Sequence, residues 1–590
     1  MKWIIARTDQ AEGSDLSSQL AQELGISVLA AKVLIARGYR DAASAREFLA
    51  PTAADLHDPF LLTDMSRAAD RLALAVKSRE SILLYGDYDV DGTSALIILK
   101  TAIELAGGQA ACHVPHRILD GYGMKSEVVE EAAQNGVKLI VSVDTGIRAN
   151  EVVKHATALG IDVIVTDHHL PEAELPPALA VLNPNRRDCQ YPEKNLCGAA
   201  VALKLASALM TTLAWDPAKR DRILESLMKL AAIATVADVV PLTGENRVIV
   251  KRGLEGLRSV KNPGLRSLLD VAGFEDGVAP SARQVAFQIA PRINAAGRMA
   301  SARDVLDLFT TTDPAHARAI AQQLHDLNKD RQDTEAEMTR AIQEQCLAQP
   351  VADCDAALVF FAEGWHRGVV GIVASRVVER FHRPAFVLGI DNGVAYGSGR
   401  SIRAFHLLDA LESMPELFTK FGGHRQAAGV TLDASRLEDF RERFRAYAAL
   451  KLTPADFEAT LDIDAEITLN EITHDAVMDV LNLAPFGFGN PPPTFVVRGV
   501  EVAAAPDVKK DKHLFLRFKS PQNGSGILRA KAWNFAERAA ELAGGSLVDV
   551  AIQFEDDAYS AARGYAPWQA ILKDVRPATM LAHERVVHAR

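Results

Sequence analysis

Five short apolar segments between residues 81 and 183 constrain the fold of this chain more than any other feature. The stretches between them are long enough for crossover connections, and some, such as EVVEEAAQNG, have the pattern of an amphipathic helix. Strands that are buried on both faces are apolar throughout, and their alternation with helices is typical of a parallel sheet covered by helices. We therefore predict an α/β domain with strands in residues 81–86, 110–115, 138–143, 162–166 and 179–183.

Changes in hydrophobic pattern divide the rest of the chain. The first 50 residues are rich in Ala and Leu, and the stretch before residue 350 carries charges at helical spacing without Gly or Pro. From about residue 456, short alternating strands predict a small closed β-barrel of about five strands. The predicted units are a helical segment (1–50), an α/β domain (51–314), a connecting helix (315–349), a second α/β domain (350–455) and the barrel (456–590).

Composition and charge exclude several classes of protein. The 590 residues contain 65 Lys+Arg against 76 Asp+Glu, a net charge of −11, so nucleic-acid binding would have to depend on local basic patches. Five Cys without a CxxC pair exclude a disulfide scaffold and a Cys-built zinc site. The sequence has no long apolar run and no secretory signal, which predicts a cytoplasmic protein without a membrane partner.

Three aspartates, Asp87, Asp89 and Asp91, follow directly after the first apolar segment in the sequence GDYDVDG. Residues two apart in extended backbone point to the same side, so these carboxylates can converge beyond the end of the strand, where open parallel sheets bind ligands. A solvated acidic loop is the alternative interpretation. Three repelling acids with no Lys or Arg among them are costly without a cation, which favours a metal site.

The same arrangement recurs after two later strands, at Asp144 and at the triplet Asp167, His168 and His169. A further candidate is Asp238 in the apolar run ATVADVVP, where a hydrogen-bonded core residue or a helix cap is the alternative. Carboxylates combined with imidazole favour Mn²⁺ or Mg²⁺ over a structural zinc. Two such ions bridged by a carboxylate would activate water and stabilise a phosphoryl transition state.

In this order the motifs resemble those of the DHH phosphoesterase superfamily, named after the triplet at 167–169. The resemblance implies two Mn²⁺ or Mg²⁺ ions, with Asp144 and His169 acting in catalysis and His169 next to the scissile phosphate. The sequence departs at Tyr85, where many relatives carry His, and Asp87 is expected to replace that ligand. The implied metal ligands are Asp87, Asp89, Asp91, Asp144, His168 and Asp238.

The second α/β pattern contains the turns GWHRGVVGIVASR, GSGRS and FGGHRQAAG. Gly lets main-chain N–H groups approach a phosphate, and Arg is a bidentate charged donor. GSGRS followed by GGH, after a DHH unit, resembles the DHHA1 substrate-binding domain.

With GDYDVDGTSA, PHRILDGYGM and APRINAAGRM, these segments resemble the RecJ family, bacterial single-strand-specific 5′→3′ exonucleases, over roughly residues 30–500. The resemblance implies that Arg117 and Tyr122 contact the entering strand. It also implies substrate contacts of Arg298, Ser398 and Arg400 with the terminal phosphate and of His424 in the GGH motif.

The predicted barrel contains a basic segment with aromatic residues. Residues 508–519 hold five basic residues against one acid, interleaved with Phe515 and Phe518. OB-folds hold single strands on basic surfaces with aromatic rings, because every base can stack. Aromatic residues in a small barrel are more often core, so we expect about two thirds of these rings to point inward. The other candidates for stacking are Trp533, Phe535 and Trp568.

The sequence thus predicts a chain with a parallel-sheet DHH catalytic domain, a connecting helix, a DHHA1 domain and an OB-fold. The predicted function is a metal-dependent exonuclease that degrades single-stranded DNA 5′→3′ in recombination and repair, supplied by a single-strand-binding protein and a helicase. One alternative is a DHH phosphodiesterase for short oligonucleotides or cyclic dinucleotides. The other is a non-catalytic DNA-binding scaffold, against which the presence of all the matched acids and both histidines argues.

Overall fold

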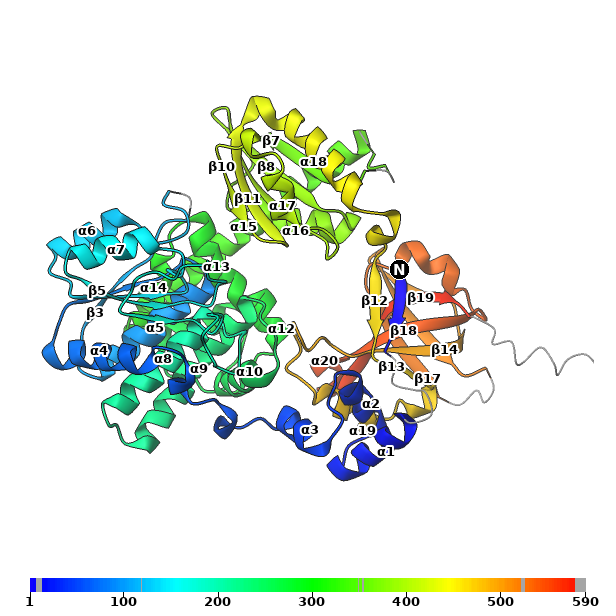
Figure 1. Ribbon diagram of the computed structural model, residues 1–590. Coiled ribbons are helices and arrows are strands. Elements are labelled where there is room, and N and C mark those ends of the chain that lie inside the picture. Colours follow the sequence, from blue (N-terminus) through cyan, green and yellow to red (C-terminus); the bar gives the residue numbers. More distant parts are fainter. Residues whose placement is uncertain (7–12, 118, 349, 353–354, 522–525, 579–590) are drawn as a thin grey trace, which may run out of the picture. The chain divides into compact units, whose positions relative to one another are not determined.

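The computed structural model describes residues 1–6, 13–117, 119–348, 350–352, 355–521 and 526–578 (Figure 1). The chain forms two compact units. The larger unit consists of residues 57–240 and 252–458, and the smaller unit of residues 1–56, 241–251 and those from 459 onward. Among the described residues no single helix is long and apolar enough to cross a membrane; one bent pair, Leu16–Leu24 with Val28–Ala36, passes by length and composition alone.

The first sheet of the larger unit is fully parallel, with the strand order β3-β2-β4-β5-β6. Side chains of α6 (Ser126–Gln134) and α7 (Asn150–Ala158) pack on one face of it. Helices α5 (Val90–Leu105) and α8 (Gly198–Thr212) pack against each other and against strands of the same sheet. All five predicted strands are confirmed: β2 (Ile82–Tyr85), β3 (Ala110–His113), β4 (Leu139–Val143), β5 (Asp162–Thr166) and β6 (Ala180–Leu182).

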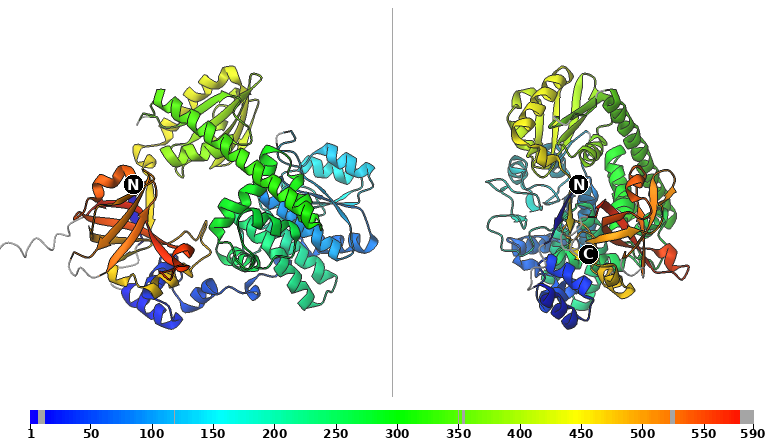
Figure 2. Two further views of the ribbon diagram at one scale, coloured as in Figure 1. Left: turned by 180° about the vertical axis from the view of Figure 1, so that it is seen from behind. Right: turned by 90° about the vertical axis from the view of Figure 1, so that its right-hand side faces the viewer.

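A single long helix, α15 (Pro314–Ala348), is the predicted connecting helix. It packs against α13 (Ala290–Met299) of the first α/β domain and against α16 (Val370–Phe381) of the second (Figure 2). Ile320, Leu324 and Met338 are buried, and so is one charged residue, Arg331, which pairs with Glu335. The amphipathic pattern read from the sequence is therefore a real helix with one apolar stripe.

The second domain of the larger unit contains a mixed sheet in the order β10-β11-β9-β8-β7. Only β7 and β8 pair in parallel, and the other neighbours are antiparallel. Helix α18 (Leu437–Lys451) and α17 (Leu407–Glu412) cover one face with a cluster of phenylalanines. The strands are β7 (Leu358–Glu363), β8 (Ala385–Asp391), β9 (Val394–Arg400), β10 (Lys420–Gly423) and β11 (Ala427–Asp433).

The smaller unit contains the barrel, in which β14 (Thr494–Val502) pairs with both β18 and β16 and so closes the sheet. The five predicted strands are present as β14, β16 (His513–Lys519), β17 (Ile527–Ala532), β18 (Leu547–Asp556) and β19 (Trp568–Pro577). Two short strands, β13 (Ala465–Ile467) and β15 (Asp507–Lys509), extend it.

The N-terminal segment is built onto the barrel. Helices α2 (Val28–Ala36) and α3 (Ala42–Leu49) share one apolar core with the barrel strands. The purely helical reading of residues 1–50 misses β1 (Lys2–Ile5), which pairs in parallel with β12 (Thr460–Ile463). A four-residue strand whose partner lies more than 450 residues away leaves no periodic signal in its own sequence.

Candidate metal centre and substrate pocket

The first acidic loop is shaped by the start of α5. The Asp89 carboxylate caps this helix and accepts hydrogen bonds from the N–H groups of Asp91 and Gly92 at 2.9 and 3.0 Å. A Cβ atom on Gly92 would lie 2.6 Å from the Asp87 carbonyl oxygen, so this close turn admits only Gly. The turn places Asp87 and Asp91, both buried, beyond the end of β2.

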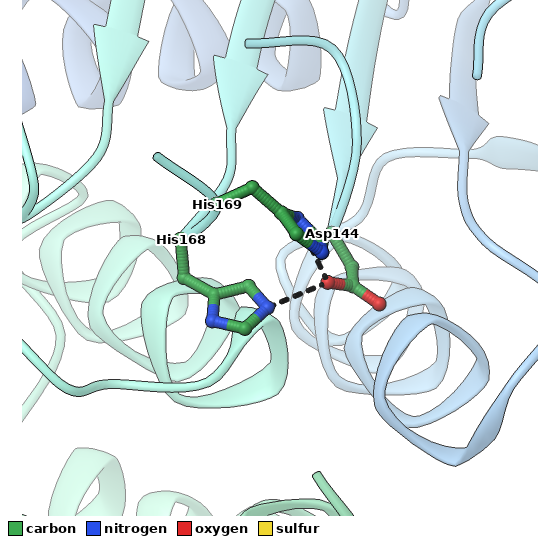
Figure 3. A group of neighbouring side chains, drawn as sticks. All are labelled: Asp144, His168 and His169. Atoms are coloured by element: carbon green, nitrogen blue, oxygen red, sulfur yellow. Dashed lines mark ion pairs between the residues drawn. The ribbon is translucent and has the colours of Figure 1, made fainter. Parts of the chain in front are cut away.

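Asp144 and the histidine pair lie at the ends of β4 and β5 (Figure 3). Asp144 has a left-handed backbone (φ 57°) and is almost completely buried. Its Oδ1 atom lies 3.1 Å from His168 Nε2 and 3.9 Å from His169 Nδ1. Strands β4 and β5 are neighbours in the sheet, so residues 24 and 25 positions apart in the sequence meet at one edge.

Asp167, the first residue of the triplet, makes hydrogen bonds of its own beside the histidine pair. It is fully buried and accepts hydrogen bonds from the N–H groups of Ile147 and His168 at 2.9 and 2.7 Å. Its Oδ1 atom also lies 2.8 Å from His169 Nδ1. Burial acts to raise the pKa of Asp167, but the hydrogen bond to His169 and the two histidine charges leave it below its usual value. Asp167 therefore orients His169.

Asp238 completes the cluster from a helix end. It is the C-cap of α9 (Pro217–Ala237), and its Oδ2 atom lies 3.7 Å from His168 Nδ1. Asp238 thus stands at a helix end and close to His168, and its role as a metal ligand stays a prediction. The ligand atoms form three compact groups: Asp87 with Asp89 and Asp144; Asp91 with His168 and Asp238; and Asp144 with His168 and His169.

Electrostatics show that the cluster fits divalent cations. Among the described residues, the buried atoms Asp87 Oδ1, Asp144 Oδ1 and His168 Nε2 have no hydrogen-bond partner. Burial and the neighbouring Asp89 raise the pKa of Asp87 to about 8. Burial and the adjacent aspartates, Asp91 first, raise the pKa of Asp144 well above its usual value. Uncompensated carboxylates beside an orphaned imidazole nitrogen are a donor set suited to Mn²⁺ or Mg²⁺.

The sequence reasoning missed the start of α8 as part of this centre. The Asp91 carboxylate accepts hydrogen bonds from the N–H groups of Gly198 and Ala199 at 2.6 and 2.7 Å. A helix N-terminus stabilises a negative charge through these free N–H groups and the helix dipole. A Cβ atom on Gly198 would lie 2.6 Å from the Asp144 Cβ atom. The only sequence signal was a Gly at the opening of an apolar helix, in CGAAVA.

The structure also describes Tyr85, the position at which the sequence departs from the DHH pattern. Tyr85 is buried, and its hydroxyl donates to the Gly123 carbonyl oxygen at 3.2 Å. The neighbouring carboxylate of Asp87, by contrast, lies within one group with Asp89 and Asp144. The role of Asp87 as a ligand remains a proposal, and its place in the cluster agrees with it.

A cavity of about 1190 Å³ opens beside this cluster within the larger unit. It is lined by residues of both α/β domains, which include His168 and His169 on one side and the β9–β11 strands on the other. Four of the six predicted substrate residues line it directly: Arg117, Tyr122, Ser398 and His424. The Tyr122 hydroxyl lies 3.3 Å from His169 Nδ1, so it is close to the metal centre as well.

The other two predicted substrate residues, Arg298 and Arg400, lie immediately behind this lining. Arg400 donates to the Ser398 hydroxyl at 2.8 Å, and Arg298 donates to the Gly368 carbonyl oxygen at 2.9 Å. Burial and the charges of Arg117 and Arg400 lower the pKa of Arg298 to about 9. In the part of the chain that the structure describes, no ion pair involves any of these three arginines. Such a cluster has the charge and the free donors to suit an anion.

Several further cavity residues were not singled out from the sequence. Arg148, Lys420 and Phe421 line the same cavity, as do Arg367 and Tyr396. The Arg367 guanidinium lies over the Tyr396 ring at 3.4 Å from its centroid. The signal for Arg367 was present, since it stands inside the quoted segment GWHRGVVG, whereas Arg148 has no such context.

Comparison with known proteins agrees with this site. Family models match the DHH family N-terminal domain over residues 81–235, the DHHA1 domain over 355–450 and the RecJ OB domain over 463–574. The single-stranded-DNA-specific exonuclease RecJ of Dickeya dadantii is 38% identical over 454 residues, which cover 75% of this chain and 79% of the relative. The chain belongs to the RecJ family.

Other RecJ proteins extend the comparison. RecJ of Bacillus subtilis is 40% identical over 516 residues, which are 86% of this chain but 63% of that longer relative. The crystal structure of Thermus thermophilus RecJ in complex with Mn²⁺ matches 98% of this chain and 80% of its own, with a TM-score of 0.82 and 31% identity. The predicted fold, with DHH, DHHA1 and OB domains, is therefore confirmed.

Proposed function

We propose that this chain is a metal-dependent exonuclease that removes nucleotides from the 5′ end of single-stranded DNA. The exonuclease activity on single-stranded DNA follows from membership of the RecJ family. Mn²⁺ or Mg²⁺ is its cofactor, since RecJ of Thermus thermophilus has been crystallised with each ion and the acidic cluster here suits both. The observation that supports action at the 5′ end is the arginine cluster of Arg117, Arg298 and Arg400 beside the metal-ligand group.

We assign two ions to the cluster. Asp87, Asp89 and Asp144 would hold one, and Asp91, His168 and Asp238 the other. Asp144 lies 3.1 Å from His168 and thus joins the two groups. The two ions supply Lewis-acid activation of water and of the phosphodiester when bound. The start of α8 holds Asp91 in place through two main-chain hydrogen bonds and so fixes the geometry of the second group.

His169 is proposed to contact the scissile phosphate. Burial acts against its protonation, but the hydrogen bond to Asp167 and that carboxylate's charge raise the pKa of His169 above its usual value. A protonated imidazole held by a buried carboxylate donates a hydrogen bond to a phosphate oxygen. Tyr122, which stacks edge-on against the His169 ring at 5.7 Å, limits the directions in which that ring turns.

The terminal phosphate is proposed to bind at Ser398 and the three arginines Arg117, Arg298 and Arg400. A terminal 5′-phosphate carries more charge than an internal diester and has one more free oxygen. Partly buried guanidinium groups without carboxylate partners recover part of their desolvation cost when they bind such an anion. The site therefore favours a phosphorylated 5′ end over the interior of a strand.

The test compares Arg400→Ala with the wild-type protein on 5′-phosphorylated and 5′-hydroxyl single strands at one salt concentration. Loss of a charge-assisted hydrogen bond costs ~1.5–3 kcal/mol, or roughly ten- to a hundred-fold in binding. We expect this loss on the phosphorylated strand and a much smaller one on the hydroxyl strand, with Mn²⁺ binding unchanged. An equal loss on both strands would assign Arg400 to general backbone contact or to folding.

The remaining assignments are proposals of the same kind. We propose catalysis in residues 51–314, substrate binding in 350–455 and capture of the strand by the barrel from 456 onward. We further propose that the protein works in the cytoplasm with a single-strand-binding protein and a helicase that supplies unwound strand. A pull-down with each partner class, in the presence of nuclease to remove bridging DNA, tests the last point.

A further inference from the structure

A second cavity, of about 860 Å³, lies beside the arginine cluster in the larger unit. We call it the arginine groove. It is formed by the helical turn Val285–Ile289, α13, α15 and the outer side of α16. Arg298 is the boundary between the two cavities, because it lines the groove and donates to Gly368, which lines the substrate pocket.

The groove carries a strong local excess of positive charge. Five arginines line it against one carboxylate, Glu335, although the whole chain has a net charge of −11. That carboxylate is already shared, since Arg331 and Arg376 lie 2.6 and 3.1 Å from its oxygens. Arg376 also pairs with Glu379 at 3.1 Å, which leaves Arg298, Arg340 and Arg380 as the groove arginines without an ion pair among the described residues. Arg340 is exposed on α15 and forms no ion pair within the described residues. The arginines are Arg298, Arg331, Arg340, Arg376 and Arg380.

The groove also offers a flat apolar surface. Phe287, in the π-helical turn before α13, lines it and is 67% exposed. An exposed aromatic ring next to several guanidinium groups matches a ligand with a phosphate at one end and a planar base at the other. A volume of about 860 Å³ is within the range of small-molecule sites.

We propose that the arginine groove binds the nucleoside 5′-monophosphate released by hydrolysis and is the path by which it leaves. This inference rests on the proposed function. After each cleavage the product phosphate still occupies the arginine cluster, while the DNA strand fills the substrate pocket on the metal side. The strand advances only when the product has left. Arg298 lines the groove and lies directly behind the pocket lining at Gly368, so it is placed to pass the phosphate to Arg340, which is exposed and has no ion pair among the described residues.

The experiment uses the full-length, metal-loaded protein and the variant Arg340→Glu. Because Arg340 is exposed and unpaired, the substitution leaves the fold intact. Arg318→Glu is the control: it makes the same charge change on the same helix, at a side chain that is 74% exposed and whose ion pair with Asp270 is long, at 4.0 Å. At 1.5 Å per residue, Arg318 lies about 33 Å from Arg340 along α15.

Two rates are measured on a 5′-phosphorylated single strand: cleavage of the first nucleotide in a single turnover and steady-state release of nucleotides. We expect Arg340→Glu to lower the steady-state rate roughly three- to ten-fold and to leave the single-turnover rate unchanged. Arg318→Glu should change neither. An equal effect of both variants, or an equal loss in both rates for Arg340→Glu, would overturn the proposal.

A binding measurement separates this proposal from the proposed function. In calorimetric titrations, thymidine 5′-monophosphate should bind Arg340→Glu and Phe287→Ala more weakly than the wild-type protein, whereas inorganic phosphate should be affected by Arg340→Glu alone. Equal binding of the nucleotide to all three proteins would contradict the groove assignment. Failure of the proposed function would show differently, as equal cleavage of 5′-phosphorylated and 5′-hydroxyl strands by the wild-type protein.

Discussion

At the scale of single residues, the candidate metal centre is a set of buried ionisable side chains whose charged forms are unfavourable without a cation. Asp144 combines near-complete burial, a left-handed backbone and a raised pKa. Such a residue lowers stability, and structures keep it where function needs it. Because it lies close both to His168 and to the group of Asp87 and Asp89, we propose it as the ligand on which both ions would depend.

Replacing Asp144 by Asn tests this role. Asn tolerates the left-handed backbone, so the change removes charge with little effect on geometry. We expect hydrolysis to fall by at least about 100-fold, and the melting temperature in the presence of chelator to stay equal or rise, because one of several repelling carboxylates is gone. Asp70→Asn, on the exposed side of the same unit, is the control. Near wild-type hydrolysis with excess Mn²⁺ would refute the two-ion assignment.

The raised pKa of Asp87 predicts that the metal-free protein becomes less stable against unfolding as pH rises. The folded-state pKa is about 8, whereas an unfolded Asp titrates near 4, so the folded protein binds the proton more tightly. Stability from this group is present at low pH and is lost as pH rises from about 4 to about 8. Thermal unfolding in chelator should therefore show a lower melting temperature at pH 8 than at pH 6.

The same thermal unfolding experiment is then repeated with Mn²⁺ in place of the chelator. A cation that binds only the folded state restores the stability, so the increase in melting temperature on adding Mn²⁺ should be larger at pH 8. The variant Asp87→Asn should flatten the dependence on pH in chelator. A dependence of unchanged size in this variant would show that other groups cause it.

At the scale of elements, the side chains of the barrel strand β16 alternate between the core and the outer surface of the barrel. Leu514, Leu516 and Phe518 point into the core, and Phe515 and Arg517 lie on the other side. Phe535 and Trp568 pack against the core as well, while Trp533 is 44% exposed. Three of the five candidate rings are thus structural, close to the expected two thirds, and Phe515 and Trp533 are the ones available for stacking.

The basic turn before β16 is expected to bind the phosphates of the single-stranded DNA. Lys509 is 2.8 Å from Asp507, and Lys510 and Lys512 are exposed with no ion pair among the described residues. Replacing all three lysines by Ala should weaken capture of long single strands. Each lost phosphate contact should reduce the slope of log K against log salt by ~0.7.

The control for this prediction is the length of the substrate. Cleavage of a bound short oligonucleotide should change far less, because the proposed metal ligands all belong to the larger unit. Affinity is measured by titration at four salt concentrations and cleavage by single-turnover assay. Equal losses for long and short substrates would show that the barrel has no separate role in capture.

At the scale of the whole molecule, the chain crosses between its two units several times. The segment 241–251 leaves the larger unit and packs in the smaller one. There Arg247, 1% exposed, donates hydrogen bonds to the carbonyl oxygens of Phe48, Leu483 and Ala484 at 2.7, 3.0 and 2.9 Å. Its guanidinium also lies 3.6 Å from the centre of the Phe48 ring. One side chain thus ties three distant chain segments together.

Since each unit has its own apolar core, we expect two thermal transitions by calorimetry. Mn²⁺ should raise only the transition of the larger unit, which holds the metal ligands. Arg247→Met should lower the temperature of the other transition only. The free energy of unfolding of the smaller unit should fall by ~3 kcal/mol or more, because several buried carbonyl oxygens lose their donor. A single transition that both changes shift equally would show that the units unfold as one.

Much of this protein is determined by local sequence. The strands β2 to β6 and the helix α15 are identifiable because burial on two faces, or on one stripe, leaves a short-range hydrophobic pattern. The acids and histidines are identifiable because each stands directly after a strand, and parallel strands bring their carboxyl ends to one edge. Asp87, Asp89, Asp144 and His168 therefore meet where the sequence predicted.

Other features are decided only by tertiary structure. The hydrogen bonds from the start of α8 to Asp91 join residues 107 positions apart. The arginine cluster brings together residues 117, 298 and 400, and Arg247 fills a cavity among segments near residues 48 and 483. None of these contacts repeats along the chain, so no periodic pattern marks them. They depend on which surfaces the packed elements present to each other, and this is fixed by the free energy of the whole fold.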